Sequence, residues 1–376
     1  MKSKSAAFLL IPLITGCLSG GNNKSNTFSL NNHSNDSASG KTLQVSYIHP
    51  NPVISIKSTG AEGIKYGFEG GRVVKVDRTY HLFTSEIYQS PFWVKMRLGY
   101  WISTDKVNWK RISTVRESSG EFNGNDPRAA LWSPLPAWDE DNNEWNLFYV
   151  SYKSAPNTAE KFLWNHEGRI WRSVSVIKGL NGISGPYEDK GIILEPGTDS
   201  QSWEGLQGTD SFFPWKVGNI WYAFYGSAKT EKIPITSWRV GFATARALAG
   251  PWKRMEDINP AEIEKQMIEN PIVTPVTGKG WLVVYDTDFN NKLRGSFGWG
   301  YSKDGVKWHE GNALVIDSAE NFWCKDVRTP MGLVDEGNGK FTMFYSGFET
   351  LPDWGNLLTG GILGTCAIGY IELEFK

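Results

Sequence analysis

Hydrophobic and polar positions alternate along this chain in a block that recurs five times. Each copy has a small or acidic turn, a short apolar run, a Gly/Asn/Asp turn and an aromatic-rich strand. Alternating β-branched and aromatic residues bounded by Gly, Asn and Asp are typical of β-strands joined by hairpin turns. The five copies are residues 68–86, 131–152, 208–227, 269–288 and 327–347.

A second hairpin, with its own internal similarity, follows most of these blocks. Residues 99–111, 240–254 and 299–311 are alike, 169–189 is a longer version, and the last copy, 366–375, keeps one strand. Four strands per copy, five copies and no long amphipathic helix predict an all-β fold, a five-bladed β-propeller with four antiparallel strands per blade. A β-sandwich is the alternative, because turn spacing alone fits both folds, but it does not explain the paired repeats.

The copies lie further apart than the roughly 40–45 residues of the commonest four-stranded blade. The additional residues must form loops, where binding sites usually lie. Because the five copies build one closed unit, we expect residues 42–376 to form a single large domain.

The N-terminus has the features of a bacterial export signal. Lys2 and Lys4 precede an apolar stretch too short for a permanent membrane span, and residues 13–17 resemble a lipobox. Residues 1–17 are therefore predicted to be a lipoprotein signal peptide with Cys17 as the lipidation site; an ordinary cleaved signal is the alternative. Residues 18–41, rich in Ser, Asn and Gly, are predicted to be a flexible tether. The expected location is the bacterial cell envelope, in the periplasm or at the outer-membrane surface, anchored to the membrane by lipid.

Composition narrows the class of partner. The net charge of −1 argues against nucleic-acid binding, which requires a basic surface. The 18 Trp residues offer flat faces suited to sugar rings, although any single Trp is more often part of a core. Cys324 and Cys366 could pair in an exported protein. No zinc spacing, Walker loop or GxSxG motif is present, so we expect that no cofactor is required; a calcium ion in the channel is left open. We also expect the protein to be a monomer.

The start of each copy carries the candidate chemistry. In a propeller the first strand of each blade lines the central channel, so these positions converge in one funnel. They hold Glu69, Ser133, Asp210, Glu269 and, beside Asp326, Arg328. Converging carboxyls shift each other's pKa, so that one can donate a proton while another stays ionised. Two carboxyls acting as acid and base are what cleavage of a glycosidic bond needs.

Four segments, taken in order, resemble those of five-bladed propeller glycosidases, most of all glycoside hydrolase family 43. They are FEGG with Glu69, LWSP at 131–134, GTDSFF with Asp210, and ENP at 269–271. The resemblance covers about residues 45–376. It implies that Glu269 is the general acid, that Asp210 tunes the pKa of the acid and binds a sugar hydroxyl, and that Glu69 is the general base of an inverting hydrolase. A funnel closed by blade loops favours release of one terminal sugar from plant or algal oligosaccharides.

Two departures from the family indicate a distant member or a sister family in the same clan. Glu69 stands where the family has Asp, which moves the carboxylate by about one methylene. The family often has a channel His in blade five that helps to hold a metal or water, whereas Arg328 occupies that place here. Its guanidinium suits a carboxylate or sulfate on the sugar; pairing with Asp326 or another blade acid is the alternative.

Each acid also has a structural alternative: Glu69 in a turn, Asp210 as a cap, and Glu269 as a solvated end of an acidic stretch. Asp288, as a ligand of hydroxyls or water, and the segment Asp126-Pro127-Arg128, projecting into the funnel, are weaker candidates. The residues that we expect to bind substrate are Trp132, Ser133, Trp203, Gln207, Asp286, Trp299 and Arg328. Two other functions stay open. One is a non-catalytic glycan-binding lipoprotein, and the other is a phosphorylase or transglycosylase, of which a phosphorylase would need a basic phosphate pocket.

Overall fold

The structure, a computed structural model, describes residues 40–233, 235, 237–259, 261, 263, 268–287, 296–316, 323–351, 353 and 364–376. The predicted signal peptide, Cys17, Asp288 and the tether up to residue 39 lie outside the described residues. No helix among the described residues is long and apolar enough to cross a bilayer.

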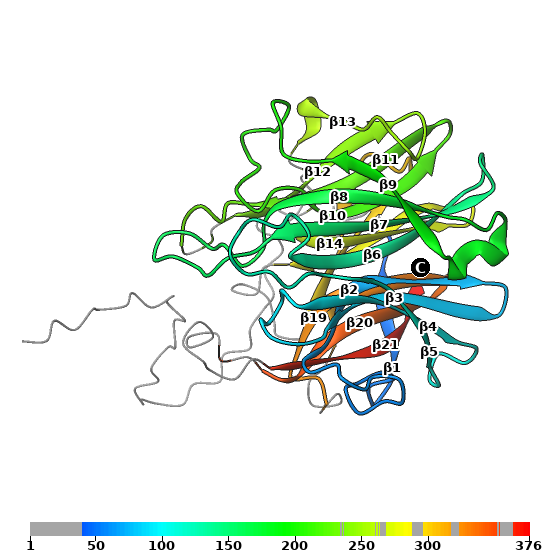
Figure 1. The fold of residues 1–376 in the computed structure, drawn as a ribbon. Helices are drawn as coiled ribbons and strands as arrows, with labels where there is room; N and C mark the ends of the chain where they lie inside the picture. The colour runs from blue at the N-terminus through cyan, green and yellow to red at the C-terminus, as the bar shows by residue number, and fades with distance from the viewer. Residues whose placement is uncertain are drawn as a thin grey trace, which may run out of the picture.

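The described residues form four β-sheets and two short 3-10 helices (Figure 1). One sheet contains β6 (Ala130–Asp139), β7 (Glu144–Lys153), β8 (His166–Ser175) and β9 (Tyr187–Leu194). A second contains β10 (Asp210–Val217), β11 (Ile220–Ala228), β12 (Trp238–Ala245) and β13 (Lys253–Arg254). A third contains β14 (Ile268–Val276), β15 (Gly280–Thr287), β16 (Ser296–Ser302), β17 (His309–Glu310) and β18 (Leu314–Val315). The helices are η1 (Leu180–Ser184) and η2 (Glu256–Ile258).

The largest sheet consists of two antiparallel groups of four strands. The first group contains β2 (Gly67–Val76), β3 (Thr79–Ile87), β4 (Met96–Ser103) and β5 (Lys110–Glu117). The second contains β19 (Asp326–Gly337), β20 (Lys340–Thr350), β21 (Thr365–Phe375) and β1 (Leu43–Ile48). A parallel pairing of Gly67 with Cys366 joins the two groups. These groups confirm the predicted all-β fold; four of the five are antiparallel and four-stranded, as predicted, and the group of β14 has a fifth short strand, β18.

The N-terminal strand completes the C-terminal group of strands. The sequence predicted one strand, 366–375, after the last repeat and no fourth strand beside it. In the structure β1 fills this place: it pairs antiparallel with β21, with Leu43 opposite Phe375 and Ile48 opposite Ile371. The two strands lie side by side at the bottom of Figure 1. The first and last strands of the described chain therefore share one edge.

The first strands of the groups form a closed ring. β2 contacts β6, β6 contacts β10, β10 contacts β14, β14 contacts β19, and β19 contacts β2 again. Hairpin turns follow these strands, and each has a residue in the left-handed region, where Gly, Asn and Asp are best tolerated. These turn residues are Asp77, Asn143, Gly218, Gly278 and Asn338.

Two outer turns confirm the second repeat of the sequence. Asp105 and Asp304 each accept hydrogen bonds from the backbone N–H groups two and three residues later, at 2.7–3.0 Å. Hydrogen bonds from Asn108 are the largest cause that lowers the pKa of Asp105, to about 2. An Asp side chain therefore builds the same turn in two of the three similar copies, 99–111 and 299–311.

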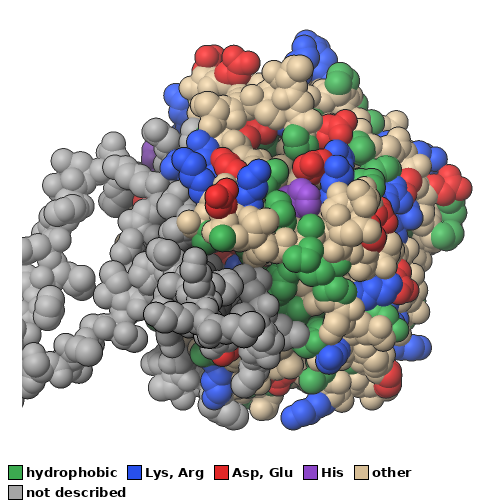
Figure 2. All heavy atoms as spheres, turned by 60° about the vertical axis from the view of Figure 1, so that its left-hand side comes forward, with side chains coloured by type: hydrophobic (Ala, Val, Ile, Leu, Met, Phe, Trp, Pro, Cys, Tyr) green, Lys and Arg blue, Asp and Glu red, His purple; other side chains and the backbone are tan. Residues whose placement is uncertain are grey.

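Aromatic side chains fill the interior, and charges are mixed on the surface. Trp215, for example, packs on Phe224 and Trp308 with ring centroids 4.7 and 5.9 Å apart. Cys324 and Cys366 are both buried free thiols, so they form no disulfide. Over the described part of the face in Figure 2, acidic and basic side chains are interspersed.

We predict that β1 stabilises the whole domain. Removing residues 1–48 exposes the edge of β21 and takes away Leu43, whose burial is worth about 2 kcal/mol. The melting temperature in a thermal unfolding experiment should fall by several degrees relative to the full chain. Removing only residues 1–39, which spares β1, is the control and should leave the melting temperature unchanged. Equal melting temperatures for the two shortened chains would contradict this role of β1.

Candidate active site

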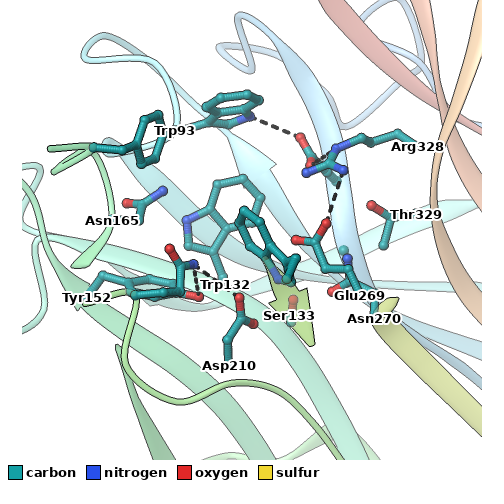
Figure 3. Close-up of a pocket in the computed structure, with 15 residues that line it drawn as sticks. Trp93, Trp132, Ser133, Tyr152, Asn165, Asp210, Glu269, Asn270, Arg328 and Thr329 are labelled. Carbon is teal, nitrogen blue, oxygen red and sulfur yellow. Dashed lines mark hydrogen bonds and ion pairs between the residues drawn. The ribbon is translucent and has the colours of Figure 1, made fainter. Parts of the chain in front are cut away.

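One pocket lies where the five first strands begin (Figure 3). It brings together seven residues that the sequence predicted for the funnel. They are Glu69 of β2, Trp132 and Ser133 of β6, Gln207 and Asp210 at the start of β10, Glu269 of β14, and Arg328 of β19. All three predicted acids therefore face one space.

A bulge in each of four inner strands sets the direction of these side chains. In each of these strands, the last residue before the bulge still pairs with the second strand of its group. The residue that follows it has a positive φ, in the left-handed region. The residues before the bulges are Glu69, Trp132, Asp210 and Glu269. The left-handed residues, with φ between 48° and 72°, are Gly70, Ser133, Ser211 and Asn270. Bulges re-aim side chains in this way next to active sites. Trp132, not Ser133 as the repeat alignment assumed, occupies the position equivalent to the three acids.

Arg328 bridges two of the acids. It lies in the bulge of β19, between Val327 and Thr329. Its Nε donates to Glu69 Oε1 at 2.7 Å and its Nη1 donates to Glu269 Oε2 at 3.2 Å. A single guanidinium joins the two oxygens, so they lie at most about 8 Å apart. The sequence left two roles open for Arg328: binding an acidic group on the sugar, or pairing with an acid of the blades. In the structure Arg328 pairs with two blade acids, Glu69 and Glu269.

The environment of Glu269 suits a proton donor. Burial raises its pKa to about 7; Arg328 works in the opposite direction, and the charges of Asp210 and Glu69 raise it further. At neutral pH a substantial fraction of this carboxyl is therefore protonated. A group of this kind can give a proton to a substrate and recover it from solvent.

Asp286 lies directly behind this acid rather than in the pocket. It is opposite Glu269 in the pairing of β14 with β15, and its Oδ2 accepts a hydrogen bond from Asn270 Nδ2 at 3.2 Å. Burial raises the pKa of Asp286 well above its usual value. The sequence placed Asp286 in contact with substrate. In the structure it lies behind Glu269 and does not line the pocket.

Asp210 is held by its own group of neighbours. Gln207 Nε2 donates to Asp210 Oδ2 at 3.2 Å and to the hydroxyl of Tyr152 at 3.3 Å. The backbone N–H of Ser211 donates to Asp210 Oδ1. Burial, and then the charge of Asp210, raise the pKa of Tyr152 well above 10, so its hydroxyl stays protonated. Figure 3 shows Asp210 and Tyr152 across the pocket from Arg328, with Trp132 between them.

Several polar atoms that line the pocket have no hydrogen-bond partner among the described residues. They are Trp132 Nε1, Trp238 Nε1, Gln207 Oε1 and Thr329 Oγ1. The cavity has a volume of about 80 Å³. Because one water needs about 10–15 Å³ of such space, it has room for about half a dozen waters. Its size and its free donors and acceptors suit one small ligand rich in hydroxyl groups.

Two predicted Trp residues lie elsewhere. Trp203 packs on Tyr225 with ring centroids 5.3 Å apart, and its indole N–H donates to Gln201. Trp299 is 2% exposed and its ring meets the edge of Phe375. Trp299 is an interior side chain and Trp203 is half-buried against the core, so position near the start of a repeat was a poor guide for Trp.

The weaker funnel candidate Arg128 also lies outside the pocket, because its guanidinium pairs with Asp189 at 2.8 Å. Among the described residues, no three His, Cys, Asp or Glu side chains are grouped as metal ligands.

Several residues of the pocket could not be identified from the repeats. Trp93, Phe162 and Asn165 come from connecting segments, Tyr152 ends the second repeat, and Trp238 begins β12. Only Tyr152 carried a signal, since it closes the aromatic strand of its block. The indole N–H of Trp93 donates to Glu69 Oε2 at 3.0 Å, so both oxygens of this carboxylate have donors.

No protein-family model matches the chain, and no curated protein matches it in sequence. Solved structures do match it in fold. A family 117 glycoside hydrolase of the marine bacterium Zobellia galactanivorans superposes with a TM-score of 0.58 and 14% identity, over 89% of this chain and 90% of that chain. The catalytic domain of a GH62 α-L-arabinofuranosidase from Coprinopsis cinerea gives 0.52 and 14%, over 88% and 97%. A GH43_1 enzyme from Xanthomonas citri, complexed with xylotriose, gives 0.51 and 11%, over 87% and 90%.

These matches confirm at the level of the fold the resemblance that the short sequence motifs predicted. The identities of 11–14% carry no further statement about activity. The chain therefore has the fold of the β-propeller glycoside hydrolases, and family 43 is among those that it resembles.

Proposed function

We propose that this protein is a glycoside hydrolase with a five-bladed propeller domain, and that it removes a terminal sugar from an oligosaccharide. The observation that carries the proposal is the bridge from Arg328 to Glu69 and Glu269 in a pocket that also holds Asp210. It supplies one carboxylate fixed by a cation and one carboxyl with a raised pKa, the two states that acid–base cleavage requires. The closed ring of five first strands supports the blade count.

In the proposed mechanism Glu269 protonates the glycosidic oxygen as the bond to the anomeric carbon breaks. Glu69, ion-paired with Arg328, takes a proton from the water that attacks the opposite face of the sugar. Asp210 raises the pKa of Glu269 through its charge and binds a hydroxyl of the sugar. With Glu269 protonated, two carboxylates face one guanidinium, so the pocket favours the positive charge that develops on the sugar ring in the transition state.

The size of the cavity supports exo action, and the resemblance to family 43 supports inversion. A cavity of about 80 Å³ fits one sugar unit better than a length of chain. The upper limit of about 8 Å between the bridged oxygens permits the roughly 6.5–8 Å at which water fits between the carboxyls of inverting enzymes; it also permits the roughly 5 Å of retaining enzymes, so the anomer of the product decides between the two. The unpartnered atoms of Trp132, Trp238, Gln207 and Thr329 are suited to the hydroxyl groups of that sugar.

The setting that we propose follows from the N-terminal sequence. Cys17 would carry the lipid that anchors the chain to the bacterial envelope, with residues 18–41 as the tether. The substrates would be oligosaccharides from plant or algal polysaccharides, and the protein would act as a monomer without a required cofactor. The pairing of Arg328 disfavours a phosphorylase, because this cation is already held by two carboxylates.

A glycoside screen with product analysis tests the function. We expect turnover of at least one aryl glycoside or oligosaccharide in a panel that includes arabinofuranosides and xylo-oligosaccharides, the sugars named for two structural neighbours. Proton NMR during hydrolysis should show the inverted anomer first, and chromatography should show only single sugars released. A retained anomer would refute inversion. Binding without turnover across the whole panel would favour the non-catalytic glycan-binding function.

The raised pKa of Glu269 predicts the pH dependence. The acid must be protonated to act, so kcat/KM should fall above about pH 7, tenfold for each further pH unit. The measurement is kcat/KM between pH 4 and 10 on the best aryl glycoside. A profile that stays flat from pH 6 to 9 would remove Glu269 as the general acid.

Substituting the acid should have an effect that depends on the leaving group. Glu269→Gln cannot donate the proton, so hydrolysis of an oligosaccharide should fall about 10²–10⁴-fold. A 2,4-dinitrophenyl glycoside needs little protonation and should lose less than about tenfold. Glu349→Gln is the matched control: burial also raises the pKa of Glu349, but this residue lies outside the pocket and its loss should leave both rates unchanged. Equal losses on both substrates would contradict the assignment of Glu269.

A further inference from the structure

Trp93 has a backbone conformation that a bulky residue rarely adopts. It lies between β3 and β4 with φ of 62°, in the left-handed region where a large side chain is disfavoured. Such conformations persist only where the surroundings enforce them, and they gather at functional sites. Trp93 also lines the pocket, so its conformation and its location point to the same place.

Aromatic neighbours hold the ring of Trp93 in one orientation. Phe92 stacks on it with ring centroids 4.7 Å apart and an interplanar angle of 28°. Trp164 meets it edge-on at 6.1 Å and 90°. Packing on two sides removes the freedom of the indole to rotate. Its N–H is thereby aimed at Glu69 Oε2, at 3.0 Å.

The two donors to Glu69 act on different oxygens. Arg328 Nε holds Oε1 at 2.7 Å, and Trp93 Nε1 holds Oε2 at 3.0 Å. A carboxylate with one donor on each oxygen cannot rotate about its terminal bond without losing both hydrogen bonds. The remaining lone pairs therefore point in fixed directions, which is what a base needs to receive a proton from water.

We propose that Trp93 is a positioning residue that orients the Glu69 carboxylate for proton abstraction from the attacking water. This inference rests on the proposed function, in which Glu69 is the general base. Trp101 provides a comparison: its indole also donates to a buried glutamate, Glu86, at 3.1 Å, but from within strand β4, away from the pocket. A Trp–Glu hydrogen bond alone thus requires no left-handed residue, and at Trp93 the unusual backbone coincides with the candidate base.

The first test is Trp93→Phe, which keeps an aromatic ring and loses the donor. We expect kcat to fall about tenfold, the usual effect of losing a hydrogen bond to a charged group, with KM changed by less than about twofold. Trp101→Phe is the control and should lower the melting temperature while leaving kcat and KM in place. An unchanged kcat for Trp93→Phe would overturn the proposal, and so would a loss that falls on KM rather than on kcat.

The second test does not depend on turnover. In protein labelled with ¹⁵N at its tryptophans, the Trp93 indole resonance is identified by its loss in Trp93→Phe. Glu69→Gln should shift this resonance upfield and leave that of Trp101 in place, since a neutral amide is a weaker acceptor. An unmoved Trp93 resonance would overturn the positioning role even if Glu269→Gln upholds the hydrolase. Absence of turnover by the wild-type protein on the whole panel would instead overturn the proposed function, and the role of Glu69 as a base with it.

Discussion

The site depends on one buried guanidinium. Arg328 has 16% of its side chain exposed and holds Glu69 and Glu269, whose side chains are 4% and 8% exposed. Two carboxyls this close would otherwise repel each other in a space with little water to screen them. The same contacts tie β19 to β2 on one side and to β14 on the other. Loss of this cation would therefore disturb the charge of the pocket and the ring of strands together.

The two acids that share Arg328 differ in their surroundings. Trp93 gives Glu69 a second donor, so each of its oxygens accepts a hydrogen bond. Glu269 is buried among acidic neighbours, and for this carboxyl burial outweighs the effect of the cation and raises its pKa to about 7. The two carboxyls thus share one positive charge but differ in their remaining contacts.

The repeats in the sequence were sufficient to predict an all-β chain and to bring Glu69, Asp210 and Glu269 to one place, because strand periodicity is local. They placed Ser133 one residue out of register, since the bulge after Trp132 is a property of the folded backbone. Residues from connecting segments, such as Trp93, follow no period and could not be found in this way. The role of β1 was missed for a different reason: its partner lies at the far end of the chain, and nothing local in either strand identifies the other.

That pairing of β1 with β21 has a consequence for the order of folding. Residues 43–48 are synthesised early, but their partner strand ends at Phe375, so they must wait for nearly the whole chain before they can pair. Contacts this distant in sequence close slowly, and until then β21 and β1 both present free backbone edges that can pair with other chains. The domain can therefore complete its fold only after residue 375 has been synthesised, and the pairing of these two strands is a step at which the chain is exposed to aggregation.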